Sequence, residues 1–148
     1  GLSYDKQLSE QEARKKGKEI RAAYVSAIPG LKELLEAVHK ASERGFVRGL
    51  DNRRILVDSR HKSLNYLLQG SAAILAKRWM VLANERLPDD THQLAFIHDE
   101  LQYESPQVAA TEVGQILEIS AKEAGEYYKM RCPVAAESKI GMTWADVH

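Results

Sequence analysis

The sequence predicts an α+β fold: a small, mainly antiparallel sheet with helices packed on one face, preceded by two helices. Apolar residues recur at helical spacing in the longer segments, whereas residues 46–57 and 94–104 are short runs of strand character. Only a few residues join neighbouring strand-like runs, which is typical of antiparallel pairs. The 148 residues have room for one domain of modest size, so we expect these elements to form one layered structure.

The first 45 residues are predicted to form a helical unit. Ser9 and Glu12 have the spacing of a capping box, which predicts a helix from there to about Ala27. Pro29 then begins a second helix at the first helical position, where its missing N–H is no loss, and Gly45 ends that helix. This unit is expected to lead into the sheet.

Residues 46–148 are predicted to form the sheet and its covering helices. A hairpin over 46–57 is followed by a long helix over 60–86. A further helix is predicted over 106–128, and residues 131–138 are expected to be the last strand. The apolar stripe of the long helix is predicted to be Leu64, Leu67, Leu68, Leu75, Trp79 and Leu82.

One stretch joins two predicted strands with almost no loop residues. Residues 94–97 and 101–104 have strand character, and His98-Asp99-Glu100 stands between them. A simple hairpin favours Asn-Gly or Asp-Gly at this place. Poor turn chemistry at one point of a chain is typical of a functional site, and a solvated hairpin tip is the alternative.

The composition is that of an ordinary soluble globular protein, with 44% apolar and 28% charged residues. No run approaches the roughly 20 apolar residues of a membrane span, and no signal-peptide pattern opens the chain. Cys132 is the single cysteine, which excludes an internal disulfide and a cysteine-based zinc site within the chain. These features fit a cytoplasmic setting, and the start at Gly1 leads us to expect a processed chain or a piece of a larger protein.

The net charge is zero, but the charges are unevenly placed. Six basic residues against two acids lie between Arg44 and Lys62, whereas seven acids against one lysine lie between Asp99 and Glu126. The first segment can face a polyanion and the second can hold cations, with a solvated surface as the alternative for each.

A row of polar side chains lies beside the apolar stripe of the long helix. His61, Asn65 and Gln69 are spaced i, i+4 and i+8, so they stack along one side of a helix. Glu and Lys are better surface choices than Asn and Gln, which makes the row a candidate binding surface; an ordinary polar flank is the alternative. The small residues from Gly70 to Ala76 permit the close approach of another helix or of a backbone.

Several motifs follow one another at suitable separations. They are Ile28-Pro29-Gly30, Gly45–Arg54, Gln69–Arg78, Phe96–Leu101 and Gly141–His148. In this order they resemble the C-terminal part of family A (DNA polymerase I-like) DNA polymerases. His98-Asp99-Glu100 is similar to that family's motif C, and residues 61–69 look closer to bacteriophage replicative members than to the bacterial repair enzyme.

The resemblance implies a place for each unit and a metal chemistry. Residues 1–45 would belong to the fingers and to the helix leading into the palm, and residues 46–148 to the C-terminal palm. Nucleotidyl transfer in this family uses two Mg²⁺ ions, and Asp99 is implied to be one metal ligand. Glu100 would support it, through water, and His98 would lie against the primer end. The strand bearing the other metal-binding Asp has no counterpart in this sequence.

The resemblance also implies contacts with primer-template DNA. It places Asn65 and Gln69 in the minor groove near the primer terminus, where amide donors can contact purine N3 and pyrimidine O2 of any correct base pair. His61 stands where the bacterial enzymes have Arg. Arg53 and Arg54 are the expected phosphate contacts on the hairpin.

We therefore expect a fragment of a template-directed polymerase of DNA replication, inactive alone because half of its metal site lies outside the sequence. Its partners would be primer-template DNA, dNTP and the N-terminal part of the polymerase, with no membrane and with self-association of exposed apolar surface. A phage-encoded chain would work in the host cytoplasm. Two alternatives are a non-catalytic, palm-derived nucleic-acid-binding module and an unrelated α+β protein that binds a cation structurally.

Overall fold

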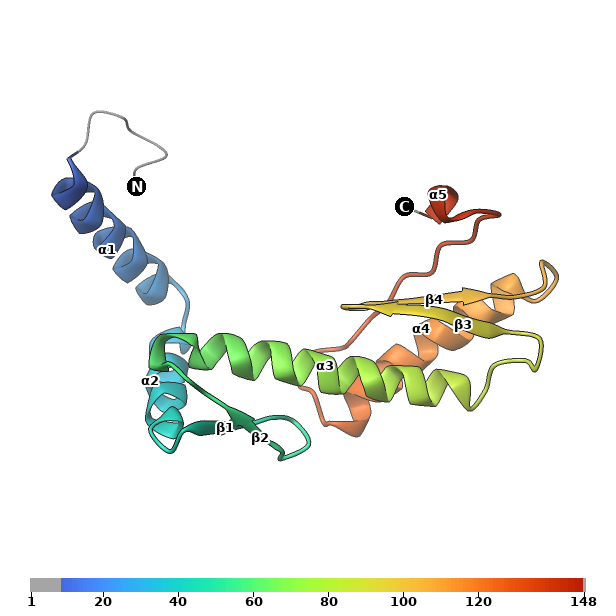
Figure 1. Cartoon of the computed structure of the whole chain (residues 1–148), viewed down its shortest axis with the longest axis horizontal. Coiled ribbons are helices and arrows are strands. Elements are labelled where there is room, and N and C mark those ends of the chain that lie inside the picture. The colour runs from blue at the N-terminus through green and yellow to red at the C-terminus, as the bar shows by residue number, and fades with distance from the viewer. Residues whose placement is uncertain (1–8, 148) are drawn as a thin grey trace.

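The computed structural model describes residues 9–147, so the first eight residues of the expected unit 1–45 and the last residue of 46–148 lie outside the described residues. Helices and antiparallel strands form an α+β fold, as predicted. Helix α3 (Ser63–Asn84) is the central element, with α2 and the first hairpin at one end and the second hairpin at the other (Figure 1).

Helix α1 (Glu10–Ala27) begins where the capping box predicts. The Ser9 hydroxyl accepts the backbone N–H of Glu12 at 3.4 Å, and the Glu12 carboxylate accepts the Ser9 N–H at 3.0 Å. Two backbone donors at the helix start are thereby satisfied, which fixes the first turn.

Helix α2 (Leu31–Ser42) begins later than the sequence indicates. Gly30, with φ 82°, is the N-cap, so the prediction that Pro29 occupies the first helical position is wrong. The left-handed backbone at Gly30 reverses the chain before the helix can start, and glycine adopts it without steric cost. Gly45 is also left-handed, at φ 80°, and its N–H donates to the Ser42 carbonyl in the turn that follows α2.

Strands β1 (Phe46–Arg48) and β2 (Arg54–Leu56) form the first predicted hairpin, with Asn52 in the left-handed conformation at φ 66°. Val47 is buried and pairs with Ile55 on the face turned toward α3. A Cβ atom added at Gly70 would lie 2.5 Å from Cδ1 of Ile55. Because Gly70 has no side chain, Ile55 of the hairpin can pack directly against α3.

Helix α4 (Ala110–Tyr127) packs along α3, and the two helices together carry most of the buried apolar side chains of the described residues. The Trp79 Nε1–H donates to the Leu117 carbonyl at 2.7 Å across this contact. Leu68, predicted to lie in the buried stripe, is 57% exposed; at about 100° per residue it points about 80° away from the buried Ala76. The buried apolar residues of the two helices are Ala76, Ala83, Val113, Ala121 and Ala124.

Strands β3 (His92–Ile97) and β4 (Glu100–Glu104) form a second hairpin, so the antiparallel strands fall into two separate two-stranded sheets. Ile97 pairs with Glu100, which leaves a two-residue loop between the strands, as the sequence predicts. The Tyr103 hydroxyl donates to Oδ1 of Asn84 at 2.8 Å and fastens the hairpin to the end of α3.

Residues 131–138 form no strand, so the prediction of a last strand there is wrong. A strand needs a partner backbone, and both hairpins pair only within themselves in the part of the chain that the structure describes. Side chains hold the segment instead: the N–H and the hydroxyl of Ser138 donate to Oε1 of Glu118 at 2.9 and 2.6 Å. The chain then reaches a short helix, α5 (Trp144–Val147).

The chain exposes a large surface for its mass. Its accessible area is 11244 Å², whereas a compact monomer of 16.6 kDa exposes about 7,600 Å². Large apolar side chains contribute to this surface, among them Leu56, Val108 and Met142. None of the described helices combines the length and the apolar character that a membrane span requires.

Candidate nucleic-acid and metal-binding site

His98 and Asp99 form the tip of the β3–β4 hairpin, and both are exposed. His98 has a left-handed backbone, at φ 56°, a conformation that non-glycine residues rarely adopt but in which His is enriched. This backbone lets two residues close the loop without glycine. The Asp99 carboxylate makes no hydrogen bond or ion pair with a residue between 9 and 147, so its oxygen lone pairs face solvent.

Glu100 is the first residue of β4 and carries the second carboxylate of the junction. Its Oε1 accepts a hydrogen bond from Nε2 of Gln102 at 2.7 Å. The sequence singles out Glu100 but not Gln102, whose amide orients that carboxylate. Alternation along β4 places residues two apart on one face, which is the signal that indicates Gln102.

The junction offers part of a metal site. Mg²⁺ prefers hard carboxylate oxygens, which Asp99 and Glu100 supply. No group of three or more His, Cys, Asp and Glu side chains gathers to hold a metal ion among the described residues. Further ligands would therefore have to come from elsewhere, and the donor chemistry of the two carboxylates fits Mg²⁺.

The β3–β4 hairpin runs back along α3 toward the end that carries the polar row (Figure 1). Its base is fixed at Asn84, and the six residues of β3 span about 20 Å, the length of about thirteen helical residues. The tip therefore extends toward the middle of α3. Asn65 and Gln69, on the N-terminal half of that helix, are exposed, and their amides make no hydrogen bond with a described residue.

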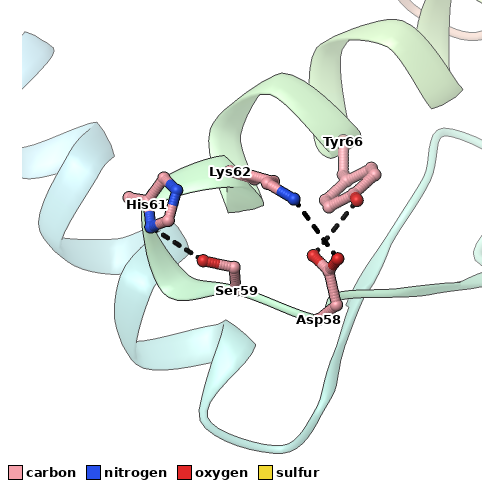
Figure 2. A network of polar contacts seen from close by, with 5 residues as sticks. All are labelled: Asp58, Ser59, His61, Lys62 and Tyr66. Atoms are coloured by element: carbon pink, nitrogen blue, oxygen red, sulfur yellow. Dashed lines mark hydrogen bonds and ion pairs between the residues drawn. The ribbon is translucent and has the colours of Figure 1, made fainter.

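His61 does not lie on α3 but on the 3₁₀ turn η1 (Arg60–Lys62) that leads into it. Its Nδ1 lies 2.7 Å from the hydroxyl of Ser59, as Figure 2 shows. The turn is fixed at its other end by Ser63, whose hydroxyl donates to the Arg60 carbonyl at 2.7 Å. The exposed imidazole therefore has a fixed neighbour on one ring nitrogen, while Nε2 is the nitrogen left for a ligand.

Asp58 anchors the same turn to α3. Its carboxylate accepts the Tyr66 hydroxyl at 3.1 Å and the Lys62 ammonium at 3.3 Å (Figure 2). The hydrogen bond from Tyr66 and then the one from Lys62 lower the pKa of Asp58. Sequence reasoning missed Asp58, Ser59 and Tyr66; the i, i+4 and i, i+8 spacing of Asp58, Lys62 and Tyr66 is the signal that indicates the anchor.

The two hairpin arginines differ in their surroundings. Nε of Arg53 lies 2.6 Å from Oδ2 of Asp51, a mostly covered carboxylate. Arg54 makes no ion pair with a described residue, and its guanidinium carbon lies 4.9 Å from the centre of the Phe46 ring. The structure thus separates a neutral pair at Arg53 from an uncompensated cation at Arg54.

The fold matches that of a solved polymerase domain. Over 84% of this chain and 24% of the other, the structure is similar to the POL domain of Pol1 from M. smegmatis in complex with DNA primer-template and dNTP, with a TM-score of 0.66 and 24% identity. The model of DNA polymerase family A matches residues 1–146. The chain belongs to this family, which excludes the alternative of an unrelated cation-binding protein.

The relatives come from phages and bacteria. The DNA-directed DNA polymerase of Enterobacteria phage T3 is 26% identical over 91% of this chain and 23% of its own length. The DNA polymerase I of Aquifex aeolicus (strain VF5) is 32% identical over 97% of this chain and 25% of its own length. The chain thus spans about a quarter of the length of each of these two relatives.

Proposed function

We propose that this chain is part of a template-directed DNA polymerase and contributes Asp99 to a two-metal site for nucleotidyl transfer. The observation that carries the proposal is the exposed Asp99 carboxylate on a two-residue strand junction, in a chain of DNA polymerase family A. The hairpin backbone fixes the position from which the Asp99 side chain extends, and no described side chain competes for its carboxylate oxygens.

The junction residues would have separate roles. Asp99 would hold Mg²⁺ directly, and Glu100, oriented by Gln102, would assist through water. When bound, two Mg²⁺ ions lower the barrier to transfer by neutralising charge on the attacking and leaving oxygens. His98, held at positive φ, would lie against the primer end. The other Asp ligand would come from a part of the polymerase that this sequence lacks.

The polar row would read the minor groove without reading sequence. Asn65 and Gln69 present amide donors one helical turn apart that bond to no described residue, and every correct base pair offers acceptors at that edge. A mismatched pair displaces these acceptors, so such contacts favour correctly paired primer ends. The likeness of residues 61–69 to phage replicative members supports a polymerase of bacteriophage type.

His61 would extend the row as a third donor. The minor-groove edge of an A·T pair offers only acceptors, and that of a G·C pair offers mainly acceptors. Nε2 of His61 therefore has to carry the imidazole proton if it is to donate a hydrogen bond to this edge. A Ser59 hydroxyl that donates to Nδ1 selects this tautomer. Ser59 would thus be a positioning residue, because it acts through the imidazole rather than on the DNA.

Arg53 and Arg54 would contact the DNA backbone from the first hairpin. Contacts of guanidinium with phosphate strengthen binding without sequence preference. The ion pair with Asp51 leads us to expect a smaller contribution from Arg53 than from Arg54.

The two units would divide between fingers and palm. Residues 1–45 would end the fingers and lead into the palm, and residues 46–148 would form its C-terminal part. Primer-template DNA, dNTP and the N-terminal part of the polymerase would be the partners. That N-terminal part would cover exposed apolar side chains, and its absence would promote self-association, which size-exclusion chromatography measures.

Primer extension tests the proposal. The purified chain should incorporate no nucleotide, whereas the chain joined to the N-terminal part of its polymerase should extend a primer in Mg²⁺. In that longer protein, Asp99→Ala should reduce the rate by at least about 10²- to 10³-fold without changing the unfolding temperature. Glu104→Ala, at the far end of β4, is the matched control. Activity of the isolated chain, or wild-type activity of Asp99→Ala, would overturn the proposal.

A non-catalytic palm-derived module is the remaining alternative. It predicts that the chain binds primer-template DNA equally well with and without Mg²⁺. It also predicts that the longer protein extends no primer, with or without the Asp99→Ala substitution.

A further inference from the structure

Three arginines surround one aromatic ring on the first hairpin. The guanidinium carbons of Arg44, Arg48 and Arg54 lie 5.2, 5.9 and 4.9 Å from the centre of the Phe46 ring. All three arginines are exposed, and each is within the reach of a cation–π contact. We call Phe46 and these three arginines the arginine cluster.

The strand register gathers these charges against the usual preference of a sheet. Arg48 and Arg54 are direct cross-strand partners, and like charges in that arrangement destabilise an antiparallel pair. Alternation places them on the face of the hairpin opposite Val47 and Ile55, which is the face turned away from α3. A local rule broken on an exposed face is typical of a binding surface.

The cluster has no compensating acid in the part of the chain that the structure describes. Arg48 donates to the carbonyl and side-chain oxygens of Asn52, and Arg44 donates to the Ala41 carbonyl. Arg54 makes no side-chain hydrogen bond with a described residue, so no described acid offsets the charge of any of the three. Arg53, the neighbour of Arg54, is instead neutralised by Asp51.

The cation–π contact between Arg78 and Tyr127 has a different setting. Arg78 of α3 lies 3.9 Å from the centre of the Tyr127 ring of α4, one cation on one ring, and joins two packed helices. The arginine cluster joins only the two strands of its own hairpin and the turn before it. Packing therefore explains Arg78 and leaves the concentration of charge at Phe46 unexplained.

We propose that the arginine cluster is a phosphate-binding surface for the backbone of a nucleic-acid duplex, with Phe46 as the plate that holds the guanidinium groups in place. The inference rests on the proposed function and extends it from Arg54 to Arg44, Arg48 and Phe46. Three cations within 6 Å of one centre lie within about 12 Å of each other, a length of duplex that carries about three phosphates of one strand.

The salt dependence of DNA binding by the purified chain tests the cluster. A fluorescein-labelled primer-template duplex is the probe, and Kd is measured by anisotropy over a series of salt concentrations. Each of Arg44→Ala, Arg48→Ala and Arg54→Ala should reduce the slope of log K against log salt by about 0.9, the value for one phosphate contact. Arg14→Ala on α1, where Arg14 forms an ion pair with Glu10 at 2.6 Å, is the matched control and should leave the slope nearly unchanged.

Phe46→Leu tests the contribution of the aromatic ring separately from that of the arginine charges. It removes the aromatic ring and keeps every arginine, so it should weaken binding and reduce the slope at unchanged net charge. Circular dichroism checks that each variant keeps its helices and strands.

Two results would overturn the inference. If the unsubstituted chain binds the duplex while a triple variant without the three arginines keeps its affinity and slope, the arginine cluster is not the phosphate surface, and the proposed polymerase function still stands. If the unsubstituted chain does not bind the duplex at low salt, the inference and the proposed contacts of this chain with DNA both fail.

Discussion

The hydroxyl oxygen of Ser59 lies 2.7 Å from Nδ1 of His61, on the turn that leads into α3. The pair faces solvent, and His61 is directed away from the Asp58 anchor beside it (Figure 2). One ring nitrogen is thus occupied within the chain, and the other is left for a partner.

Ser59→Ala should weaken the binding of primer-template DNA through His61 alone. One neutral hydrogen bond contributes about 1 kcal/mol, so we expect an approximately five-fold rise in Kd, and no further rise when Ser59→Ala is added to His61→Ala. Ser26→Ala, which removes a serine hydroxyl from α1, is the control.

The tautomer gives a second readout that a merely structural role of Ser59 would not change. The ¹⁵N chemical shifts of His61, recorded above the usual titration range of imidazole, should show a proton on Nε2 that becomes shared with Nδ1 in Ser59→Ala. Equal weakening by Ser59→Ala in the presence and absence of the His61 imidazole would contradict the positioning role.

In the chain joined to the N-terminal part of its polymerase, Gln69→Ala should weaken DNA binding at a correctly paired primer terminus and reduce mismatch discrimination. Both effects should be larger than its effect on nucleotide binding. The loss of an amide donor predicts a change of about five- to ten-fold. A duplex with 3-deazapurine at the terminus lacks the N3 acceptor and should bind the unsubstituted chain and Gln69→Ala equally well. Gln115→Ala on α4 is the matched control, and an unchanged terminus affinity in Gln69→Ala would count against the minor-groove role.

Two glycines in helix interiors should respond to alanine in opposite directions. A Cβ at Gly17 meets nothing within 4 Å, so Gly17→Ala should stabilise α1 by about 1 kcal/mol. A Cβ at Gly125 would lie 2.7 Å from Cγ2 and 3.0 Å from Cβ of Val134, and overpacking of this kind costs about 1–3 kcal/mol, which exceeds the gain in helix propensity. Thermal and urea unfolding followed by circular dichroism measure both changes; stabilisation by Gly125→Ala would show that residues 131–138 do not pack against α4.

Low pH should detach residues 131–138 from α4, because hydrogen bonds from Ser138 to the Glu118 carboxylate hold them there. Hydrogen bonds from the Ser138 hydroxyl and then from its N–H lower the pKa of Glu118 below its ordinary value of 4.5. The stabilisation is therefore fully present above that value and is lost as the pH falls through the lower pKa of the folded state. The Ser138 amide resonance, followed by NMR as the pH is lowered, reports the release, and Glu118→Gln should abolish this pH dependence. The same transition in Glu118→Gln would assign it to another carboxylate.

Local signals account for what the sequence predicts well. The capping box at Ser9, the hairpin within residues 46–57 and the short junction at His98 depend on neighbours within a few positions, and the structure has all three. The α+β class follows from the same local patterns. Exposure of Asn65 and Gln69 also follows from helical spacing, because their row lies beside the leucine stripe.

Features that depend on partners far along the chain were not predictable in this way. Residues 131–138 have strand character, but in the structure they pair with none of the described strands. The exposure of Leu68 depends on which face α4 covers. The arginine cluster depends on the hairpin register that places Arg48 opposite Arg54, and the role of Ser59 depends on a 3₁₀ turn that helical spacing does not indicate.

The contact between Ile55 and Gly70 sets the spacing of two surfaces. Ile55 stands between Arg54 and Leu56 on β2, and Gly70 follows Gln69 on α3, so the space at Gly70 fixes how far the arginine cluster lies from the polar row. In the proposed complex, one surface contacts phosphates and the other contacts the floor of the minor groove. The distance between the two surfaces would then match one groove depth, and groove depth differs between B-form and A-form duplexes. The packing of Ile55 against Gly70 would thus determine which duplex geometry the palm binds.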